Sequence, residues 1–359
     1  MSVRRLLRAS AYRRLVGVGG IGTGIFLTVE GERTLGRNES RAARLLDVRD
    51  YCKLHIVAHH VAILCGASPS REPFHVVPIG AVGADEAGRR LLAEMAAVGI
   101  DTAHVREVSD RPTLFSVCFQ YPDGSGGNLT TVDSAAATLT EGDVERAADM
   151  LDPRTIAVAM PEVDLAPRRR LLELAAGAGA FRAGSFTSAE LAEADGLLGL
   201  LDLLALNEDE AAVLAGRRLD PADPTPFLEA LGRAVADAGP VPRLLVTAGA
   251  HGAFACERSA WAHRPALPAP VRSTAGAGDA LLGAVLAALA ADVPLLATGD
   301  APAALRSGLD LGVALAALAV TSPHTIHPEA DLDAVLAFAR EAGLAPAPPL
   351  SEVIRASDA

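Results

Sequence analysis

The feature that most constrains the fold is the alternation of short apolar strands with helical segments after Thr140. The predicted strands cover residues 155–160, 201–206 and 243–247, with a weaker one near Phe181, and the helical patterns cover residues 141–151, 166–178, 188–199, 208–215 and 224–238. Such alternation is typical of a parallel sheet with helices on both faces. Ligands of such sheets bind where the strands end at their carboxyl edge. We therefore expect an α/β fold with its site at these strand ends.

The first third of the chain combines the same pattern with two hairpin-like regions, about 24–50 and 111–133. We expect these two regions to form a small sheet that covers a site. The flanking patterns predict an opening strand from Leu15, a helix at 53–64 ended by Gly66, a strand at 74–82 and a helix from Gly83 to Gly99.

The end of the chain predicts strands at 254–261 and 270–272 and helices at 280–290, 303–319 and 331–342. The expected organisation is a basic extension at 1–14, a single domain at 15–344 and a flexible Pro/Ala-rich tail at 345–359.

A glycine-rich turn, Gly276-Ala277-Gly278, leads into Asp279 and then into an apolar helical run. The first amides of a helix have no intrahelical acceptor and lie at its positive end, so this turn can bind phosphate oxygens. A carboxylate at that point is placed to accept a proton from an attacking hydroxyl. The simpler interpretation of Asp279 is a helix N-cap.

Two further polar stretches follow predicted strands. Asn207 to Glu210 comes after the strand at 201–206, and Thr247 to Gly252 comes after the strand at 243–247. Each is unremarkable by itself, but parallel strands bring their ends to one edge. We therefore expect both stretches to meet the turn before Asp279.

A second glycine pattern, Gly17-x-Gly19-x-x-Gly22, matches the fingerprint of a nicotinamide-binding dehydrogenase. That motif requires a helix directly afterwards. Here Gly24 to Glu30 is β-branched and alternating, which favours a strand.

The composition limits the partners. The chain has 359 residues, 21% of them charged, and a net charge of −12. Nucleic acid and anionic membranes are therefore poor partners. The scattered cysteines at 52, 65, 118 and 256, and the absence of a secretory signal, predict a cytoplasmic protein with reduced thiols.

These motifs together resemble the ribokinase family, also called the PfkB carbohydrate kinases. The resemblance rests on Ser273–Asp279, on Asn-x-x-Glu at Asn207 and Glu210, on Thr-x-Gly-x-x-Gly from Thr247, and on residues 77–88, 98–102, 111–113 and 121–124. It implies a ribokinase-like three-layer α/β/α fold with a mostly parallel central sheet and a small β-sheet lid. It also implies a homodimer that pairs through the lid.

The resemblance further implies transfer of the γ-phosphoryl group of ATP to a hydroxyl of a sugar, polyol or related acceptor, with Mg²⁺. Asp279 is then the general base, and the amides of Gly276, Ala277 and Gly278 bind the transferring group. Asn207 and Glu210 lie near the metal and its waters. The nucleotide contacts Thr247, Gly249, Gly252 and Thr274.

The acceptor half departs from the family pattern. The place of a substrate-binding Asp falls at Gly24, and Ser273 and Ala275 replace the usual Asp and Thr of the last motif. Near the expected acceptor site stand Tyr51, Lys53, His55 and His59, and Lys53 is the only lysine of the chain. This group predicts an anionic or unusual polyol acceptor; the alternative is an ordinary core helix.

Two functions from different classes remain open. One is an active kinase with an altered acceptor pocket. The other is a non-catalytic relative that binds nucleotide or metabolite and acts through a partner. The intact Asp279 favours the first, and the altered acceptor half favours the second.

Overall fold

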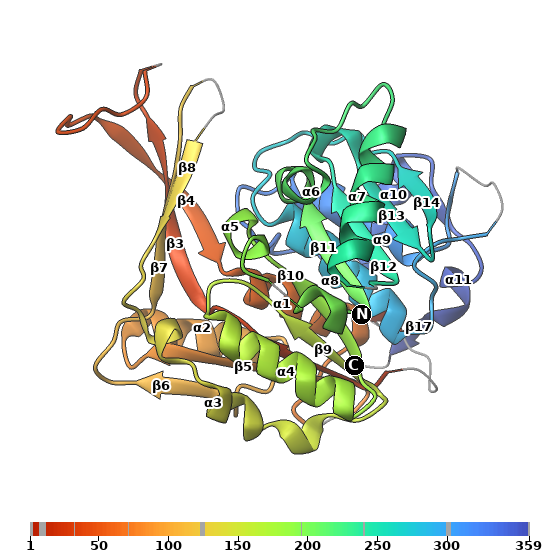
Figure 1. Cartoon of the computed structure of the whole chain (residues 1–359), viewed down its shortest axis with the longest axis horizontal. Helices are drawn as coiled ribbons and strands as arrows, with labels where there is room; N and C mark the ends of the chain where they lie inside the picture. The colour runs from red at the N-terminus through yellow and green to blue at the C-terminus, as the bar shows by residue number, and fades with distance from the viewer. Residues whose placement is uncertain are drawn as a thin grey trace.

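The computed structural model describes residues 3–6, 12–31, 33–70, 72–122, 126–194, 196–239, 241–298 and 303–357. Its centre is a nine-stranded sheet in the order β14-β13-β12-β11-β10-β9-β2-β5-β6 (Figure 1). The seven strands from β12 to β6 are parallel, and β13 and β14 are antiparallel at one edge. The strands are β2 (Arg14–Val18), β5 (His75–Gly83), β6 (Val105–Val108), β9 (Thr155–Ala159), β10 (Phe181–Ser185), β11 (Leu203–Asn207), β12 (Arg243–Thr247), β13 (Ala253–Glu257) and β14 (Ala260–Arg264).

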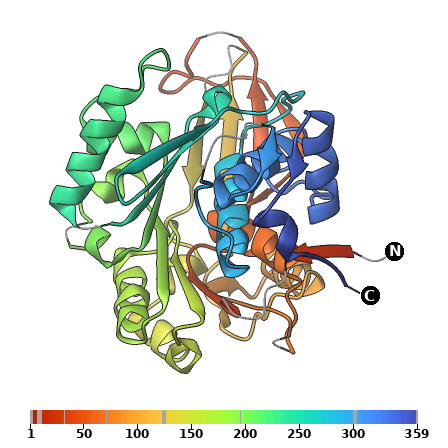
Figure 2. The ribbon, with the colours of Figure 1, turned by 90° about the vertical axis from the view of Figure 1, so that its right-hand side faces the viewer.

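Helices cover both faces of this sheet, as the alternating pattern predicted. One face packs against α1 (Lys53–Cys65), α2 (Glu86–Ala97), α8 (Ala277–Ala290), α9 (Gly308–Ala319) and α10 (Leu332–Glu341). The other packs against α3 (Glu141–Glu145), α4 (Leu165–Gly177), α5 (Ser188–Leu191), α6 (Glu208–Ala215) and α7 (Thr225–Ala238). Figure 2 shows the green and blue helices on opposite sides of the strands. The three-layer α/β/α architecture is confirmed.

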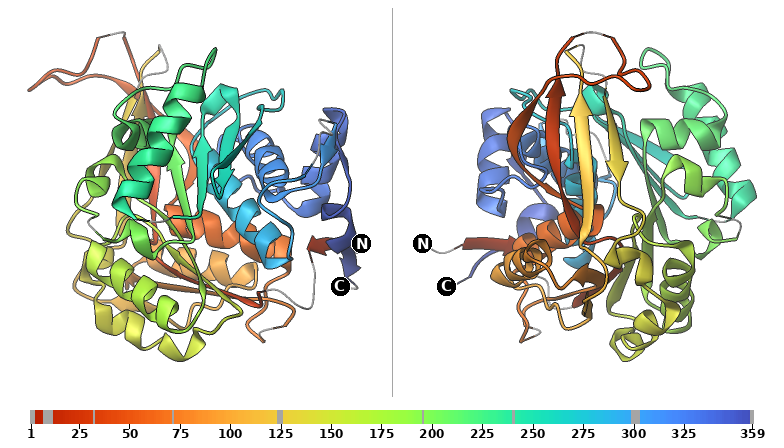
Figure 3. Two further views of the ribbon diagram at one scale, coloured as in Figure 1. Left: turned by 45° about the vertical axis from the view of Figure 1, so that its right-hand side comes forward. Right: turned by 90° about the vertical axis from the view of Figure 1, so that its left-hand side faces the viewer.

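A separate four-stranded sheet, here called the lid, has the order β4-β3-β7-β8. It consists of β3 (Gly22–Val29), β4 (Ala43–Tyr51), β7 (Leu114–Gln120) and β8 (Gly126–Thr130), and it stands out from the body of the protein (Figure 3, right). β3 and β7 are parallel, and the two outer pairs are antiparallel. The small mixed sheet predicted from residues 24–50 and 111–133 is therefore present; residues 123–125 of its predicted turn lie outside the described part.

The strand β3 also settles the interpretation of Gly17, Gly19 and Gly22. After β2 the chain continues into β3, which begins at Gly22 itself. A dinucleotide fingerprint needs a helix there, whose N-terminus binds the pyrophosphate. The nicotinamide alternative is therefore wrong.

The two ends of the chain differ from expectation. In the described part of the tail, β16 (Ala345–Pro346) pairs with β15 (Ala304–Leu305), and α11 (Leu350–Val353) leads into β17 (Ile354–Ser357). β17 pairs antiparallel with β1 (Val3–Leu6), which belongs to the predicted N-terminal extension. Leu350 and Val353 are buried in the main core, and this apolar burial makes the tail an ordered part of the fold. The prediction of a flexible tail is therefore wrong for the described residues 345–357.

Several predicted elements are shorter or divided. The pattern at 141–151 forms α3 and a 3₁₀ turn, η2 (Ala148–Met150), and the pattern at 188–199 forms α5 and another, η3 (Leu198–Leu200). Gly196, with φ +69°, lies between α5 and η3 and interrupts the helix predicted at 188–199. The strand predicted at 254–261 is the hairpin β13–β14, because Arg258 and Ser259 both have positive φ, as tight hairpin turns require. Residues 270–272 form no strand.

Among the described residues, none of the helices is long and apolar enough to cross a membrane.

Candidate active site

The ends of β11 and β12 and the start of α8 meet at a cavity of about 230 Å³, here called the transfer cavity. The polar side chains that line it come from α1, α6, α8, three strand ends and the loop before α8: Lys53, Ser185, Asn207, Glu210, Thr247, Thr274 and Asp279. Gly276 and Gly278 add backbone atoms to the lining. The structure thus brings together the three stretches that were expected to converge from their positions after parallel strands.

The turn before α8 is built for close approach of the backbone. Gly276 has φ +80°, and a Cβ at this position would lie 2.3 Å from the carbonyl oxygen of Thr325. The first i to i−4 bond of α8 runs from Ala280 N to Gly276 O at 2.8 Å. The amides of Gly278 and Asp279 precede it, and Ala277 N donates to Thr274 O at 3.3 Å. The helix start therefore presents amides and the positive end of its dipole to the cavity.

Asp279 lies at this helix start, with only 13% of its side chain exposed. Its Oδ1 lies 3.7 Å from Nζ of Lys53, which projects from the first residue of α1. Burial raises the pKa of Asp279, and the ammonium of Lys53 opposes that rise. The carboxylate of Asp279 in turn raises the pKa of Lys53, so the two side chains form a charged pair.

Asn207 and Glu210 form a capping box at the start of α6. Asn207 Oδ1 accepts from Glu210 N at 2.8 Å, and Glu210 Oε2 accepts from Asn207 N at 2.8 Å. Glu210 is 6% exposed, and burial raises the pKa of its carboxyl group. The cap fixes one carboxylate oxygen and holds the group at the cavity wall. This arrangement suits Mg²⁺, which binds proteins through one or two carboxylates and retains waters and phosphate ligands.

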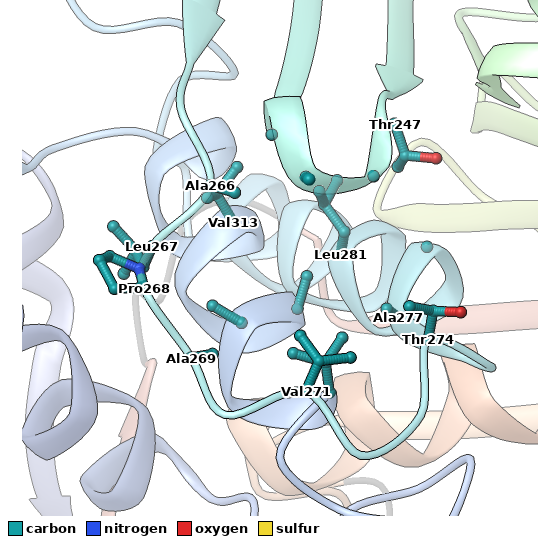
Figure 4. Close-up of a pocket in the computed structure, with 17 residues that line it drawn as sticks. Thr247, Ala266, Leu267, Pro268, Ala269, Val271, Thr274, Ala277, Leu281 and Val313 are labelled. Carbon is teal, nitrogen blue, oxygen red and sulfur yellow. The ribbon is translucent and has the colours of Figure 1, made fainter. Parts of the chain in front are cut away.

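A second, larger cavity of about 640 Å³ adjoins the first and is here called the donor cavity (Figure 4). Thr247, Thr274 and Gly278 line both cavities, so the two are continuous. Gly249 and Gly252 belong to the turn that leads from β12 into β13, and they line the donor cavity. The rest of its lining is chiefly small and apolar: Ala250, Ala266, Leu267, Pro268, Ala269, Val271, Ala277, Leu281, Val313, Ala316, Ala317 and Val320.

Glu162 is not among the residues predicted from the sequence. It follows β9 with φ +75°, a conformation that is uncommon for a residue other than glycine. Its Oε2 accepts from the backbone N of Lys53 at 3.2 Å. Burial raises the pKa of Glu162 to about 7, against the opposing charge of Lys53. Its only local signal is an acidic residue two positions after the predicted strand at 155–160, which by itself is unspecific.

The remaining predicted substrate residues lie elsewhere. His55 is 1% exposed, its ring lies 4.6 Å from that of Tyr51, and neither His55 nor His59 lines the transfer cavity. Burial lowers the pKa of His55 to about 3 and that of His59 to about 4, so both rings are neutral. Gly24 lies in β3, opposite Asp50 of β4. Of the four, only Lys53 lines the transfer cavity.

The geometry defines a class of site: an apolar nucleotide-sized cavity that opens onto a helix N-terminus with a buried carboxylate. A family model for the pfkB family carbohydrate kinases matches residues 61–332, and the chain belongs to this family. Its members are phosphotransferases with an alcohol group as acceptor. No curated protein sequence matches the chain significantly.

Solved structures agree on the fold. The ribokinase of Arabidopsis thaliana, complexed with ribose and ATP, is 19% identical with a TM-score of 0.67, over 92% of this chain and 99% of that one. The nucleoside kinase of Burkholderia thailandensis, in complex with inosine, is 18% identical with a TM-score of 0.67, over 91% of this chain and 97% of that one. An E. coli protein assigned as a ribokinase II, in complex with ATP and Mg²⁺, is 16% identical with a TM-score of 0.68, over 92% of this chain and 99% of that one.

Proposed function

We propose that this protein transfers the γ-phosphoryl group of ATP to a hydroxyl of a sugar, polyol or related acceptor, with Asp279 as the general base. The observation that carries the proposal is the position of Asp279 in the smaller of two adjoining cavities, directly after Gly278, which lines both. The larger cavity has the size and apolar lining of a nucleoside site. The smaller one holds Asp279 beside the amides of a helix start.

Each residue has a defined part in this reaction. Asp279 accepts the proton of the acceptor hydroxyl as that oxygen attacks the γ-phosphorus, and the bond from this phosphorus to the departing ADP breaks. The amides around Gly276, Ala277 and Gly278 stabilise the charge on the transferring group. Thr247, Gly249, Gly252 and Thr274 contact the nucleotide. Asn207 and Glu210 would hold Mg²⁺, and the ion would supply neutralisation of charge on the phosphates.

The charge balance favours a neutral acceptor. Lys53 is the one lysine of the chain, and three carboxylates act on it, from Asp279, Glu162 and Glu210. Its charge is therefore already compensated before any ligand enters. An acceptor with its own negative charge meets net repulsion here, whereas hydroxyl groups find acceptors for their hydrogen bonds. This argues against the anionic acceptor expected from the sequence.

The lid supplies both water exclusion and a surface for pairing. Closure of a lid over the reacting groups limits hydrolysis of ATP. On its outer strands, Leu45 is 66% exposed and Leu129 is 66% exposed. Exposed apolar groups of this kind are typical of contact surfaces. We infer that the partner is a second copy of this chain, which pairs lid to lid.

The test is acceptor-dependent release of ADP from ATP and Mg²⁺ with a panel of sugars, polyols and nucleosides. Asp279→Asn should lower kcat by about 10²- to 10⁴-fold, the usual contribution of a general base. The variant should still bind ATP, which a thermal shift measures. If no acceptor exceeds the Asp279→Asn control while ATP still raises the Tm, the kinase proposal fails and the non-catalytic binding module takes its place.

A further inference from the structure

A third cavity, of about 470 Å³, lies where the edge strand β6 meets α3; both elements are labelled at the lower left of Figure 1. It is here called the edge cavity. The polar side chains in its lining belong to Arg106 of β6, His104 directly before β6, Asp143 of α3 and Arg146, which caps the end of α3. None of these four residues lines the transfer cavity or the donor cavity.

The carboxylate of Asp143 holds the two arginines in place. Its side chain is only 6% exposed, and its Oδ1 accepts from Nε of Arg106 at 3.2 Å and from Nη2 of Arg146. Its Oδ2 accepts from the backbone N and the hydroxyl of Thr140, both at 2.8 Å. Although burial acts to raise the pKa of Asp143, these hydrogen bonds lower it to about 2. The acceptor positions of this carboxylate are therefore occupied.

The two guanidinium groups have donors left for a ligand. Nη2 of Arg106 donates to the carbonyl oxygen of Thr138 at 2.8 Å and to its hydroxyl at 3.0 Å, so this group is fixed on two sides. Nη1 of Arg146 donates to the carbonyl oxygen four residues earlier at 3.2 Å. In the part of the chain that the structure describes, Nη1 of Arg106 and Nε of Arg146 have no hydrogen-bond partner.

The lining of the edge cavity has more positive than negative charge. It contains two arginines and one carboxylate, and the other acids of β6 and α3 do not line it: Glu107, Glu141 and Glu145. Asp101, shortly before β6, is paired elsewhere, because its Oδ2 bonds to Nε2 of His75 at 2.9 Å and its Oδ1 accepts from a backbone N–H at 3.1 Å. In a chain with a net charge of −12, this cavity is a locally positive place that favours an anion.

We propose that the edge cavity is a binding site for a phosphate group, either on a small phosphate monoester or as free inorganic phosphate. The planar fork of arginine matches phosphate oxygens, and a guanidinium group that is already fixed loses little freedom on binding. A phosphate has enough oxygens to accept from Arg106 and Arg146 at once, and His104 can add a donor from its ring. The cavity is larger than a phosphate ion, so it leaves room for the polar remainder of a monoester.

The test measures binding by calorimetry. The probes are inorganic phosphate, D-ribose 5-phosphate, D-glucose 6-phosphate and glycerol 3-phosphate. The protein is first saturated with Mg²⁺ and a nonhydrolysable ATP analogue, so that the turn before α8 is occupied and does not compete for the probes. We expect Arg146→Gln to weaken binding of the best probe by about 10- to 100-fold, as for hydrogen bonds between charged groups. The affinity of the wild type should fall as the salt concentration rises.

The matched control is Arg233→Gln on α7. Arg233 is 69% exposed and pairs with Glu229 of its own helix, as Arg146, 61% exposed, pairs with Asp143. The control removes the same charge away from the edge cavity and should leave the affinity within twofold. Arg146→Lys keeps the charge without the fork, so its affinity should lie between those of the wild type and Arg146→Gln. Equal Tm values for Arg146→Gln and Arg233→Gln show that the loss is not a folding defect.

The proposal is overturned if the wild type binds none of the four probes, or if Arg146→Gln binds them as tightly as Arg233→Gln. A monoester that binds more tightly than inorganic phosphate supports the proposal and assigns the site to a phosphorylated metabolite. Equal affinities support it and assign the site to phosphate itself. The result does not depend on the proposed kinase function, because the edge cavity shares no residue with the other two cavities.

Discussion

Nζ of Lys53 lies 3.7 Å from Oδ1 of Asp279, so the only lysine of the chain is paired with the proposed general base. The pair joins the first turn of α1 to the first turn of α8 across the transfer cavity. Lys53 opposes the effect of burial on Asp279 and keeps this side chain in the ionised form that accepts a proton.

Replacement of Lys53 by Met should therefore change the pH dependence of the reaction. Without the ammonium group, burial alone acts on Asp279 and its pKa rises further. The acidic limb of the kcat/KM profile should move up by about one pH unit, the lower end of the effect of an opposite charge. Activity should fall most at low pH and approach the wild-type value at high pH.

Lys53→Arg retains the positive charge and serves as the control; its acidic limb should stay near that of the wild type. An acidic limb that does not move in Lys53→Met would show that the pair has no influence on the base. A uniform loss at every pH would instead assign Lys53 to binding of the acceptor or the phosphates.

The donor half of the site could be predicted because its signals are local in sequence. Asn207 and Thr247 each end a predicted strand, and the glycines before Asp279 announce a helix start. Because parallel strands end at one edge of the sheet, these residues are expected to meet at that edge. Glu162 was not predicted because an acidic residue after a strand is a weak signal, and its contact with the start of α1 depends on tertiary structure. Its backbone has a positive φ, and its carboxylate accepts from the backbone N of Lys53.

The chain ends illustrate the same limit. The tail is rich in Pro and Ala, a composition that by itself favours a loose segment, yet β17 pairs with β1. The tail is ordered because it pairs with a strand more than 340 residues away in the sequence. A pattern within the tail cannot reveal so distant a partner.

Gly276→Ala should damage both the fold of the turn and catalysis. The φ of +80° disfavours any residue with a Cβ, and the new methyl group would meet the carbonyl oxygen of Thr325 at 2.3 Å. We expect a loss of more than about 1 kcal/mol in stability and of about 10²- to 10³-fold in kcat, as when a stabilising donor is displaced. Thermal unfolding and initial rates measure the two effects.

Gly278→Ala is the matched control for the fold. Its methyl group would make only an ordinary contact, 3.6 Å from Oγ1 of Thr247, and Gly278 has no positive φ. This variant should melt like the wild type while its activity falls, because Gly278 lines both cavities. Equal Tm values for both variants would contradict the account of Gly276.

The lining of the donor cavity predicts weak discrimination between purine bases. Among the residues that the structure describes, Thr247 and Thr274 are the only ones with polar side chains in its lining, and both also line the transfer cavity beside Asp279. A base held by apolar contacts is not strongly rejected when its exocyclic groups change, unlike one held by dedicated hydrogen bonds. We expect kcat/KM for GTP to lie within about 100-fold of that for ATP.

Ala316→Leu tests the location of this cavity, because the larger side chain enters it from α9. The KM for ATP should rise about 5- to 150-fold, since overpacking costs about 1–3 kcal/mol, whereas the KM for the acceptor should change little. A kcat/KM for ATP more than about 10⁴-fold above that for GTP would point to a dedicated hydrogen bond to the base. That result would refute the prediction of weak discrimination between purine bases.

The stability of the protein should decline on acidification because of a cluster of buried histidines in α1. Burial lowers the pKa of His55 to about 3 and of His59 to about 4, and it also lowers the pKa of His60 well below its ordinary value. The unfolded chain, with a histidine pKa near 6.5, binds more protons than the folded one below that pH. Stability is therefore fully present above pH 6.5 and is lost as the pH falls from 6.5 towards 4.

Between pH 7 and pH 5 each fully buried histidine should contribute a loss of about 1–2 kcal/mol, which chemical denaturation at a series of pH values measures. His55→Asn should reduce the slope of stability against pH in this window, whatever its effect at pH 7. His251→Asn, at an exposed position, should leave the slope as it is. If the His55→Asn slope equals that of the wild type, His55 is protonated in the folded protein and its ring is not desolvated as the structure shows.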